Sequence, residues 1–317
     1  MGTRSTNVAI DFVDKSLINQ ETIKLFNQYK MNMSVRELSL KTVYQYEADL
    51  NQWFRYIYIY QDNKSILEID EDDLQEFFYF CKMAGNQSRR NKRRMASISA
   101  LYKFLRKKKF TAENPMEFID RPQKDADVYV KTFLTKDQVT LMKHKLKENG
   151  NLQLELYANL SLSTMARVNA MVHLRWEQMD ANEQTFDDVL EKEGKRVTLY
   201  YNDECADLLK RVKEDRQEKG IDDHGWVFYS TRGNINGEAL DTNTLNSWAH
   251  KVGNLIGVPE LHPHDFRHSG SQLMMLEGAP IDLISGLLNH EGLDVTRKFY
   301  LRPDKERTKR EKDKYSI

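Results

Sequence analysis

The stretch HPHDFRH, residues 262–268, gathers three histidines and an arginine within seven positions. Pro263 suits the first turn of a helix. In a helix that begins there, His264, Arg267 and His268 stand at positions i, i+3 and i+4 and so lie on or near one face. The arginine fork donates hydrogen bonds to a phosphate oxyanion, and an adjacent imidazole can move a proton near neutral pH. The spacing therefore indicates a site for a reacting phosphate.

Two other interpretations of this stretch stay open at this point. A metal site needs three or more ligands in a nearly closed shell. The chain has no HExxH motif, and Asp265 is the nearby carboxylate with ligand spacing. The stretch can also be the solvated polar face of an ordinary helix. The rest of the chain has to decide between the three.

Arg167 is a second candidate. It falls within STMARVNAMVHLRWEQM, a largely apolar run with a helical pattern. A guanidinium in such a setting needs an anionic partner. That partner is either a bound phosphate or an internal carboxylate such as Glu155 or Glu177.

Three further residues become candidates through their positions. Lys192 stands in EKEGKR, where the Glu193-Gly194 pair between alternating apolar residues predicts a hairpin tip. His290 ends an apolar helical run, and Tyr300 follows ten residues later. Each is ordinary by itself, as a solvated turn lysine, a helix-end histidine or a core tyrosine. Only their combination with the arginines makes them specific.

The elements that must position these residues follow from the periodicity of apolar side chains. The first 110 residues or so predict a small helical bundle, with helices over 35–60, 70–83 and 88–108. Residues 113–135, with two prolines, predict an extended linker. Beyond it we expect helices over 134–146, 153–179 (with a break near Ser163 and Thr164) and 203–220, a hairpin over 187–202, a short strand or extended segment over 225–230, and helix again from 241.

Charge is segregated along a chain whose formal net charge is zero. Residues 77–112 contain no Asp or Glu, while SRRNKRR and LRKKK fall in the same stretch. The helix over 88–108 therefore carries a basic face, and clustered cations of this kind bind the DNA backbone with little sequence information. The residues expected to contact DNA phosphates are Arg89, Arg90, Lys92, Arg93, Arg94, Lys103, Arg106 and Lys107.

The composition limits the class of protein. The 317 residues are 40% hydrophobic and 30% charged, which suits a globular protein of about two domains. No apolar run reaches the roughly 18–20 residues of a membrane span, and the first residues lack the apolar core of a secretory signal. Cys81 and Cys205 stand far apart, so we expect neither a disulfide nor a CxxC metal knuckle. A cytoplasmic protein without a membrane partner is expected.

In chain order the candidates run Arg, Lys, His-x-x-Arg, His, Tyr, a set far more specific than any one member. On TMARVNAMVHLRW, LEKEGKRV, HPHDFRHS, LLNH and VTRKFY, the chain resembles the tyrosine recombinase (phage integrase) family. The likeness extends upstream to the basic helical region and the proline-containing linker. It assigns catalytic roles to Arg167, Lys192, His264, Arg267, His290 and Tyr300.

The resemblance implies a site-specific recombinase, a DNA strand transferase that uses no metal, ATP or other cofactor. Tyr300 would attack DNA and form a 3′-phosphotyrosyl link. Lys192 would be the general acid, with Lys195 as the alternative. His290 and the two arginines would hold the scissile phosphate, and His264 would accept the tyrosine proton.

The resemblance also implies a mainly α fold with a small β-sheet (α+β), in which an N-terminal helical core-binding (SAM-like) domain and a C-terminal catalytic domain form a C-shaped clamp on double-stranded DNA. We expect a monomer when free, a homo-tetramer in the synaptic complex on specific recombination sites, and association with the nucleoid. The expected boundaries are an N-terminal extension over 1–34, the helical DNA core-binding domain over 35–119, a linker over 120–132 and the catalytic domain over 133–317.

The chain departs from the family pattern near Arg167. Many members have a glycine two residues before this arginine and a glutamate three residues after it, where this chain has Met165 and Ala170. The alternatives are a DNA-binding regulator that kept the fold and lost recombination, a type IB topoisomerase and a metal-dependent nuclease. His262 is assigned to loop structure and His268 to packing.

Overall fold

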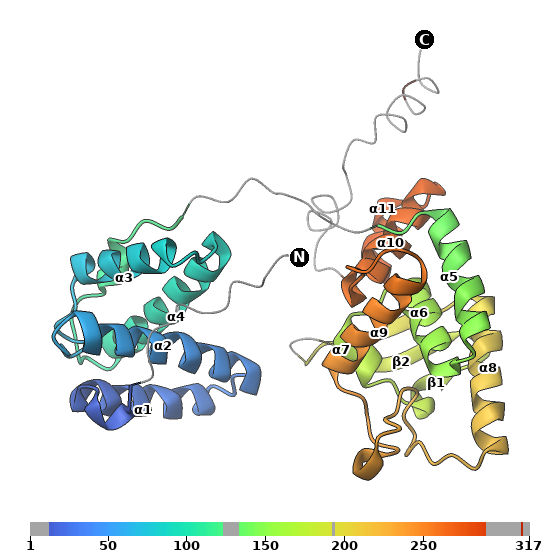
Figure 1. The fold of residues 1–317 in the computed structure, drawn as a ribbon, viewed down its shortest axis with the longest axis horizontal. Helices are drawn as coiled ribbons and strands as arrows, with labels where there is room; N and C mark the ends of the chain where they lie inside the picture. Colours follow the sequence, from blue (N-terminus) through green and yellow to red (C-terminus); the bar gives the residue numbers. More distant parts are fainter. Residues whose placement is uncertain (1–12, 123–132, 192–193, 290–311, 313–317) are drawn as a thin grey trace. The chain divides into compact units, whose positions relative to one another are not determined.

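The chain forms two compact units, residues 1–129 and 130–317, each with its own hydrophobic core (Figure 1). The computed structural model describes residues 13–122, 133–191, 194–289 and 312. Three residues expected to act in catalysis, Lys192, His290 and Tyr300, lie outside the described residues.

Helices make up the first unit, and polar caps fix where they begin. The side chains of Asn19, Ser39 and Asp70 each accept a hydrogen bond from a backbone N–H of the following turn. The helices predicted over 35–60, 70–83 and 88–108 are confirmed, the first of them beginning at Leu40. The bounds are α1 (Gln20–Val35), α2 (Leu40–Tyr60), α3 (Glu71–Met83) and α4 (Ser88–Lys107), with 3-10 helices at Lys15–Leu17 and Pro115–Glu117.

Apolar residues at helical spacing close this bundle. In α3, Leu74, Phe77, Phe78 and Cys81 are buried, while Phe80 is only partly buried. In α4 the apolar residues spaced three and four apart are buried: Met95, Ile98, Leu101, Tyr102 and Leu105.

Helix α1 belongs to this core, which corrects an expected boundary. Leu25, Phe26 and Tyr29 lie on one face of α1 and are buried in the bundle. The rings of Phe26 and Phe54 meet edge to face, with 5.2 Å between their centroids. Assigning residues 20–34 to an extension outside the helical domain is therefore wrong.

The segment after α4 also packs on the first unit before the linker begins. Pro115 and Met116 are buried in the 3-10 helix that follows α4. Glu117 in the same turn pairs with Arg106, 2.8 Å between Oε1 and Nη1. The extended linker expected from residue 113 therefore begins further along the chain.

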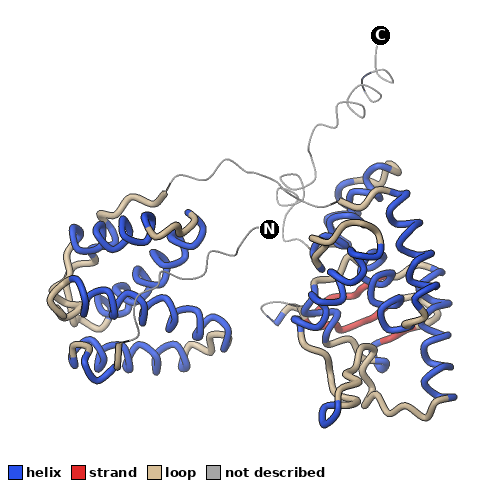
Figure 2. The backbone as a smooth tube through the Cα atoms, viewed as in Figure 1, coloured by secondary structure: helices blue, strands red, loops and turns tan. Residues whose placement is uncertain are grey.

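Helices surround a small antiparallel sheet in the second unit, and Figure 2 shows how little of this unit is strand. The strand order is β1-β2-β3. The strands are β1 (Met179–Asp180), β2 (Thr185–Leu190) and β3 (Arg196–Tyr200). The helices are α5 (Lys136–Asn149), α6 (Leu152–Thr164), α7 (Val168–Val172), α8 (Asp203–Glu218), α9 (Thr242–Leu255), α10 (Pro263–Leu276) and α11 (Ile281–Leu287), with 3-10 turns at Trp176–Gln178 and Gly233–Ile235.

The predicted hairpin is confirmed. Val189 of β2 pairs with Val197 of β3, and Gly194 in the turn has a φ of +77°, which favours glycine. The segment 225–230 is extended and makes isolated bridges rather than a strand of the sheet.

The helix predicted over 153–179 is broken into shorter elements. Helix α6 ends at Thr164, which confirms the expected break, and α7 is a separate short helix. Residues after α7 lead into the sheet. Arg167 therefore stands in the break, as the residue that precedes α7, rather than inside a continuous helix.

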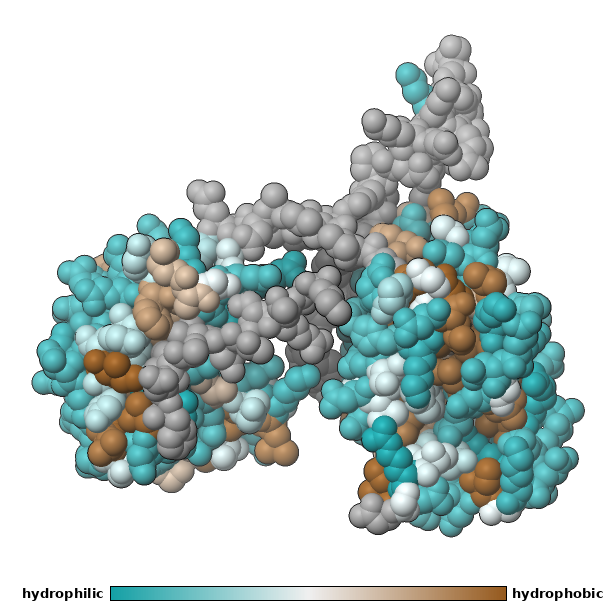
Figure 3. Space-filling view, in the orientation of Figure 1, coloured by the Kyte–Doolittle hydropathy of each residue, from teal (hydrophilic) through white to brown (hydrophobic). Residues whose placement is uncertain are grey.

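The surface is largely polar. Figure 3 shows hydrophilic side chains over most of the visible face of both units, with hydrophobic ones in separate groups. In the part of the chain that the structure describes, no helix combines the length and the apolar character needed to span a membrane. Cys81 and Cys205 are both buried, and both are free thiols.

Candidate active site

Arg267 anchors the candidate site. It lies on α10, is 4% exposed, and donates hydrogen bonds to the backbone carbonyls of Met165, at 2.7 Å, and of Leu288. Met165 and Leu288 are the residues at the C-terminal ends of α6 and α11. Carbonyls at helix ends lack helical partners and favour a nearby cation. Arg267 therefore joins three helices through two of the five N–H groups of its guanidinium.

A glycine lets α10 approach α6 closely enough for this bond. A Cβ at Gly270 would lie 2.4 Å from the carbonyl oxygen of Leu162 and 2.9 Å from Cγ of Met165. Any side chain at this position would push the two helices apart. The separation would move Arg267 away from the Met165 carbonyl.

Met165 gives a physical reason for one departure from the family pattern. Its backbone is left-handed, with a φ of +53°, a conformation that costs a non-glycine residue about 1–2 kcal/mol. A glycine at this position would avoid that cost. The Met165 side chain is instead buried against Met275, Ile284 and Leu288, so the burial of apolar surface offsets the backbone strain.

Arg167 pairs with a carboxylate other than those expected from the sequence. Its Nη1 donates to Oε2 of Glu191, which directly follows β2. The Glu191 side chain is 1% exposed and the Arg167 side chain 29% exposed. Glu155 and Glu177, the partners expected from the sequence, form ion pairs with other arginines. The expected partners are therefore wrong, because the break before α7 and the fold of the hairpin bring Glu191 to Arg167.

His264 stands one turn before Arg267 on α10, and part of its side chain is open to solvent. Its pKa lies below the ordinary histidine value, first because the protein around the ring excludes water. The positive charges of Arg267 and Arg167 lower it further. His264 and Arg267 lie one turn apart on α10, and Arg267 binds the carbonyl of Met165, two residues before Arg167, so the three residues lie in one region. A neutral imidazole at neutral pH can accept a proton.

The other two histidines of the motif have structural contacts. The backbone N–H of His262 donates to the Asp265 carboxylate at 2.7 Å, and its ring packs against His250 with 4.6 Å between centroids. The His268 ring meets that of Phe133 edge to face, 6.3 Å between centroids. Among residues 13–122, 133–191 and 194–289, no three His, Cys, Asp or Glu side chains cluster closely enough to hold a metal ion.

Lys195 extends from the hairpin to the end of α11, next to the residue that binds Arg267. Its Nζ donates to the carbonyl oxygen of Asn289 at 3.4 Å. Asn289 follows Leu288, whose carbonyl binds Arg267, so the hairpin and the end of α11 converge beside the arginine. Lys192, the general acid expected from the resemblance, lies outside the described residues, and Lys195 is the alternative.

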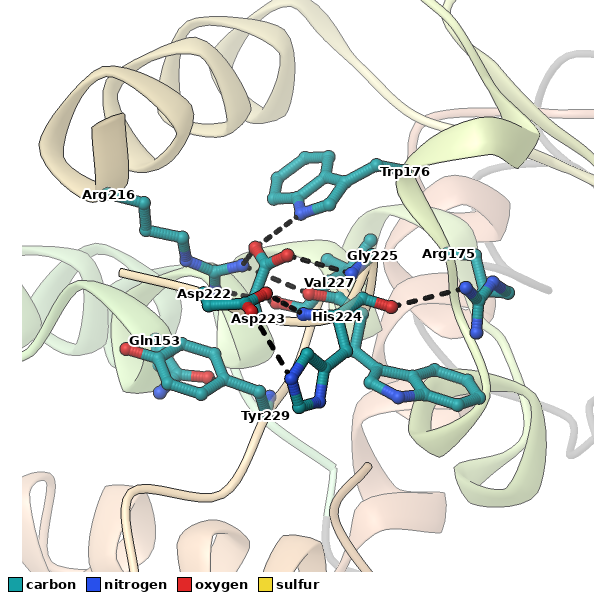
Figure 4. Close-up of polar contacts among 11 residues, drawn as sticks. Gln153, Arg175, Trp176, Arg216, Asp222, Asp223, His224, Gly225, Val227 and Tyr229 are labelled. Carbon is teal, nitrogen blue, oxygen red and sulfur yellow. Dashed lines mark hydrogen bonds and ion pairs between the residues drawn. The ribbon is translucent and has the colours of Figure 1, made fainter. Parts of the chain in front are cut away.

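A second polar cluster, centred on Asp223, stabilises the fold of the second unit (Figure 4). Its carboxylate accepts hydrogen bonds from Trp176 Nε1 at 2.8 Å, Arg216 Nη1 at 2.6 Å and the Gly225 backbone N–H at 2.9 Å. The buried Arg216 guanidinium also donates to two backbone carbonyls of the segment 225–230. The cluster fixes that segment against α8, and no motif in the sequence pointed to it.

Arg94 corrects part of the expected DNA interface in the first unit. It is wholly buried, and its guanidinium donates to the sulfur of Cys81 at 3.0 Å and to Oε1 of Gln52 at 2.5 Å. Arg93 is partly exposed and binds both carboxylate oxygens of the buried Asp49, at 2.8 and 2.9 Å. Arg94 faces the core of the bundle and cannot reach a phosphate, so the prediction for this residue is wrong.

The other cations of α4 that were expected to contact DNA differ in their exposure to solvent. Arg90 and Lys92 are partly buried. Lys103, Arg106 and Lys107 stand at i, i+3 and i+4 near the end of α4 and present one cationic face. The exposed residues of the set expected to contact DNA are Arg89, Lys103, Arg106 and Lys107.

Two family models match this chain. The model of the phage integrase family matches residues 132–307, and the model of the phage integrase N-terminal SAM-like domain matches residues 26–109. The first match alone covers more than half of the 317 residues. The chain belongs to the phage integrase family. The resemblance inferred from the Arg, Lys, His-x-x-Arg, His, Tyr order is thereby confirmed.

Two proteins named tyrosine recombinase XerC align with most of the chain. Tyrosine recombinase XerC of Staphylococcus carnosus (strain TM300) is 23% identical over 267 residues, which are 83% of this chain and 87% of the relative. Tyrosine recombinase XerC of Leptospira interrogans serogroup Icterohaemorrhagiae serovar Lai (strain 56601) is 24% identical over 306 residues, 94% of this chain and 93% of the relative.

Solved integrase structures share the fold. The Tn1549 transposon integrase in complex with circular intermediate DNA has a TM-score of 0.69 at 15% identity, over 90% of this chain and 98% of that one. A lambda integrase tetramer bound to a Holliday junction has a TM-score of 0.68 at 14% identity, over 87% and 76%. At these identities the likeness establishes the fold alone. The expected class, mainly helical with a small sheet and with SAM-like and integrase domains, is confirmed.

Proposed function

We propose that this chain is a site-specific DNA recombinase that cleaves and rejoins DNA strands through a 3′-phosphotyrosyl intermediate. The observation that carries the proposal is the position of Arg267, which lies one turn after His264 on α10 and binds the end of α11 and the end of α6, two residues before Arg167, in a member of the phage integrase family. Two guanidinium groups and a neutral imidazole suit the transfer of an anionic phosphate.

The two arginines would offset the negative charge of the scissile phosphate. Arg267 is held by two helix ends, and Arg167 is held by Glu191. Donors that are fixed before the substrate binds stabilise developing charge without a cost of reorganisation. In the proposed reaction His290 adds a further hydrogen bond to the phosphate.

Tyr300 is the proposed nucleophile. Its hydroxyl oxygen forms a bond to phosphorus while the bond from phosphorus to the 5′-oxygen breaks. A free phenol has a pKa of about 10, so a base must take the proton, and His264 is the proposed acceptor. Lys192 or Lys195 gives a proton to the departing 5′-oxygen. A second strand's 5′-hydroxyl can reverse the step without ATP, because the phosphotyrosyl link keeps the energy of the phosphodiester.

The proposed partner is double-stranded DNA that carries a recombination site. The exposed cations of α4 would contact its phosphates, and the helical and catalytic domains, joined by the linker, would close on the duplex as a clamp. We further propose a free monomer that forms a homo-tetramer on two paired sites, in the cytoplasm with the nucleoid. Lambda integrase forms a tetramer bound to a Holliday junction in its crystal structure.

Covalent trapping on a pool of nicked suicide duplexes tests the proposed function. Wild-type protein is expected to form a covalent protein–DNA adduct, detected on a denaturing gel, and sequencing of the trapped DNA identifies the site. Tyr300→Phe is expected to form none, because the substitution removes the oxygen that bonds to phosphorus.

The same assay separates the alternatives. Wild-type protein that binds DNA and forms no adduct would refute the proposal in favour of a DNA-binding regulator. Relaxation of supercoiled DNA by the monomer, without a specific site, would identify a type IB topoisomerase. Cleavage that disappears on chelation of divalent cations would identify a metal-dependent nuclease.

The histidine motif yields a prediction with a matched control. We expect His264→Ala to slow adduct formation by about 10²–10⁴-fold, the range for a positioned acid or base. We expect His262→Ala to change the rate by no more than about twofold. The backbone N–H of His262, which binds Asp265, is kept in the alanine variant. Single-turnover rates of the two variants, measured side by side, check the prediction.

The pH dependence of cleavage tests the role of His264 separately. The pKa of His264 is lowered in the folded protein, so the ring is neutral at pH 7. Wild-type cleavage should therefore decline only as the pH falls below the ordinary histidine value of about 6.5 and through the lower folded value. An acid decline that is identical in wild type and His264→Ala would show that another group is the base.

A further inference from the structure

The carboxylate of Glu191 lies beside Arg167 and has no part in the proposed cleavage reaction. It is buried, and its Oε2 accepts a hydrogen bond from Nη1 of Arg167. Its Oε1 is also buried and has no hydrogen-bond partner among the described residues. The carboxylate of this ion pair is therefore buried, whereas the guanidinium is partly exposed to solvent.

The hairpin fixes the carboxylate in place. The backbone N–H of Glu191 donates to the carbonyl oxygen of Lys195 at 2.7 Å, across the turn. The residue before it, Leu190, pairs with Arg196 in the register of β2 and β3. A buried side chain that directly follows a paired strand, with its backbone bonded across the turn, has little freedom. Glu191 is therefore the less mobile member of the pair, and its position determines the orientation of the Arg167 guanidinium.

The energetics of a buried carboxylate hold the pair together. A buried ion without its partner is strongly unfavourable, so Glu191 needs the cation that the fold brings to it. The five N–H groups of a guanidinium lie in one rigid plane, so a bond at one nitrogen sets the direction of the others. One turn further along α7, the Ala170 side chain is buried in the apolar core and has no acceptor atom. The orientation of Arg167 thus depends on a residue of the hairpin.

We propose that Glu191 is a positioning residue for Arg167, aiming its guanidinium at the scissile phosphate through the buried ion pair. The inference rests on the proposed function, because the phosphate in question is the one that Arg167 holds in that reaction. Glu191 does not touch DNA in this scheme and acts through Arg167.

The test measures single-turnover adduct formation at saturating DNA, together with DNA affinity, for Glu191→Ala and Glu191→Gln. Alanine removes the anchor, and we expect a fall in rate on the order of 10²-fold, as for a misplaced catalytic group. Glutamine keeps the size and one acceptor oxygen, so we expect an intermediate fall and normal folding. DNA affinity should be unchanged in both variants, since the DNA does not contact Glu191.

A comparison made in the Arg167→Lys variant separates a positioning role of Glu191 from an effect on folding. Arg167→Lys keeps a positive charge and lacks the rigid fork, so its alignment depends less on Glu191. The loss caused by Glu191→Ala should be much smaller in that background, as expected for two residues that act through one contact. Glu155→Gln is the matched control, because Glu155 is a buried carboxylate paired with Arg211 at 3.7 Å in the same unit. It should leave the cleavage rate of the folded protein unchanged.

Each outcome decides the inference. Wild-type rates in Glu191→Ala, or equal losses in the Arg167 and Arg167→Lys backgrounds, would overturn the positioning role and leave the proposed function intact. Weakened DNA binding at an unchanged saturating rate would also overturn it. Wild-type protein that forms no adduct would overturn the proposed function and this inference with it.

Discussion

Arg267→Ala is expected to abolish detectable adduct formation and to destabilise the second unit by about 3–5 kcal/mol. The substitution removes a proposed phosphate ligand. It also leaves the carbonyls of Met165 and Leu288 without the cation that joins the ends of α6 and α11 to α10. Urea unfolding followed by tryptophan fluorescence measures the stability, because three of the four tryptophans lie in residues 130–317.

Two further variants separate the two roles of Arg267. Arg267→Lys keeps the charge and can reach one carbonyl, so we expect it to recover part of the stability while cleavage stays low. Arg175→Ala is the control, because Arg175 also donates to a backbone carbonyl, that of His224 at 3.2 Å. It should cost about 1 kcal/mol and leave the cleavage rate unchanged. Cleavage by Arg267→Ala at the wild-type rate would contradict the proposed role.

Features decided within a few neighbouring residues could be predicted from the sequence. A helix does begin at Pro263, as the motif predicts, and Ser39 and Thr135 are N-caps of the residue types that favour this position. Caps and first-turn preferences depend on side chains that reach only their own turn. The family could likewise be predicted from the order of six residues along the chain: Arg167, Lys192, His264, Arg267, His290 and Tyr300.

Contacts between distant segments could not be predicted in this way. Glu191 lies 24 residues from Arg167, and only the break before α7 and the hairpin bring them together. Arg94 belongs to a run of cations that indicates a basic face, but the orientation of α4 turns this one toward Cys81 and Gln52. Charge in a sequence shows that a cationic surface exists, and the packing of the helix decides which of its members reach that surface.

Helix α1 is a different case, because the sequence contains its signal. Asn19 is a favourable N-cap, and Leu25, Phe26, Tyr29 and Met33 follow the spacing of an amphipathic helix. The expected boundary at residue 35 overlooks this pattern. A match of the SAM-like domain model from residue 26 agrees with the inclusion of α1 in the first domain.

Asp223→Asn is expected to destabilise the second unit by about 2–4 kcal/mol at neutral pH, because it leaves the buried Arg216 without a counter-charge. Burial raises the pKa of Asp223, but the hydrogen bonds from Trp176, Arg216 and Gly225 outweigh it, and the pKa lies below the ordinary aspartate value. The folded-state pKa is therefore lower than the unfolded one. The carboxylate contributes stability above an unfolded value of about 3.9 and loses it as the pH falls through the folded value.

The control for this prediction is Asp222→Asn, one residue away. The Asp222 side chain is 79% exposed and pairs with His224 at 3.3 Å, so the change should be within about 0.5 kcal/mol. Unfolding in urea at several pH values should show a gap between wild type and Asp223→Asn that is constant near neutrality and narrows in acid. A gap that is absent at neutral pH, or that does not narrow, would contradict the role of the carboxylate. Because the bonds of the cluster run to α8 and the segment 225–230, folded Asp223→Asn should still cleave DNA at the wild-type rate. Arg216 would then support stability alone, whereas Arg267 would support both stability and catalysis.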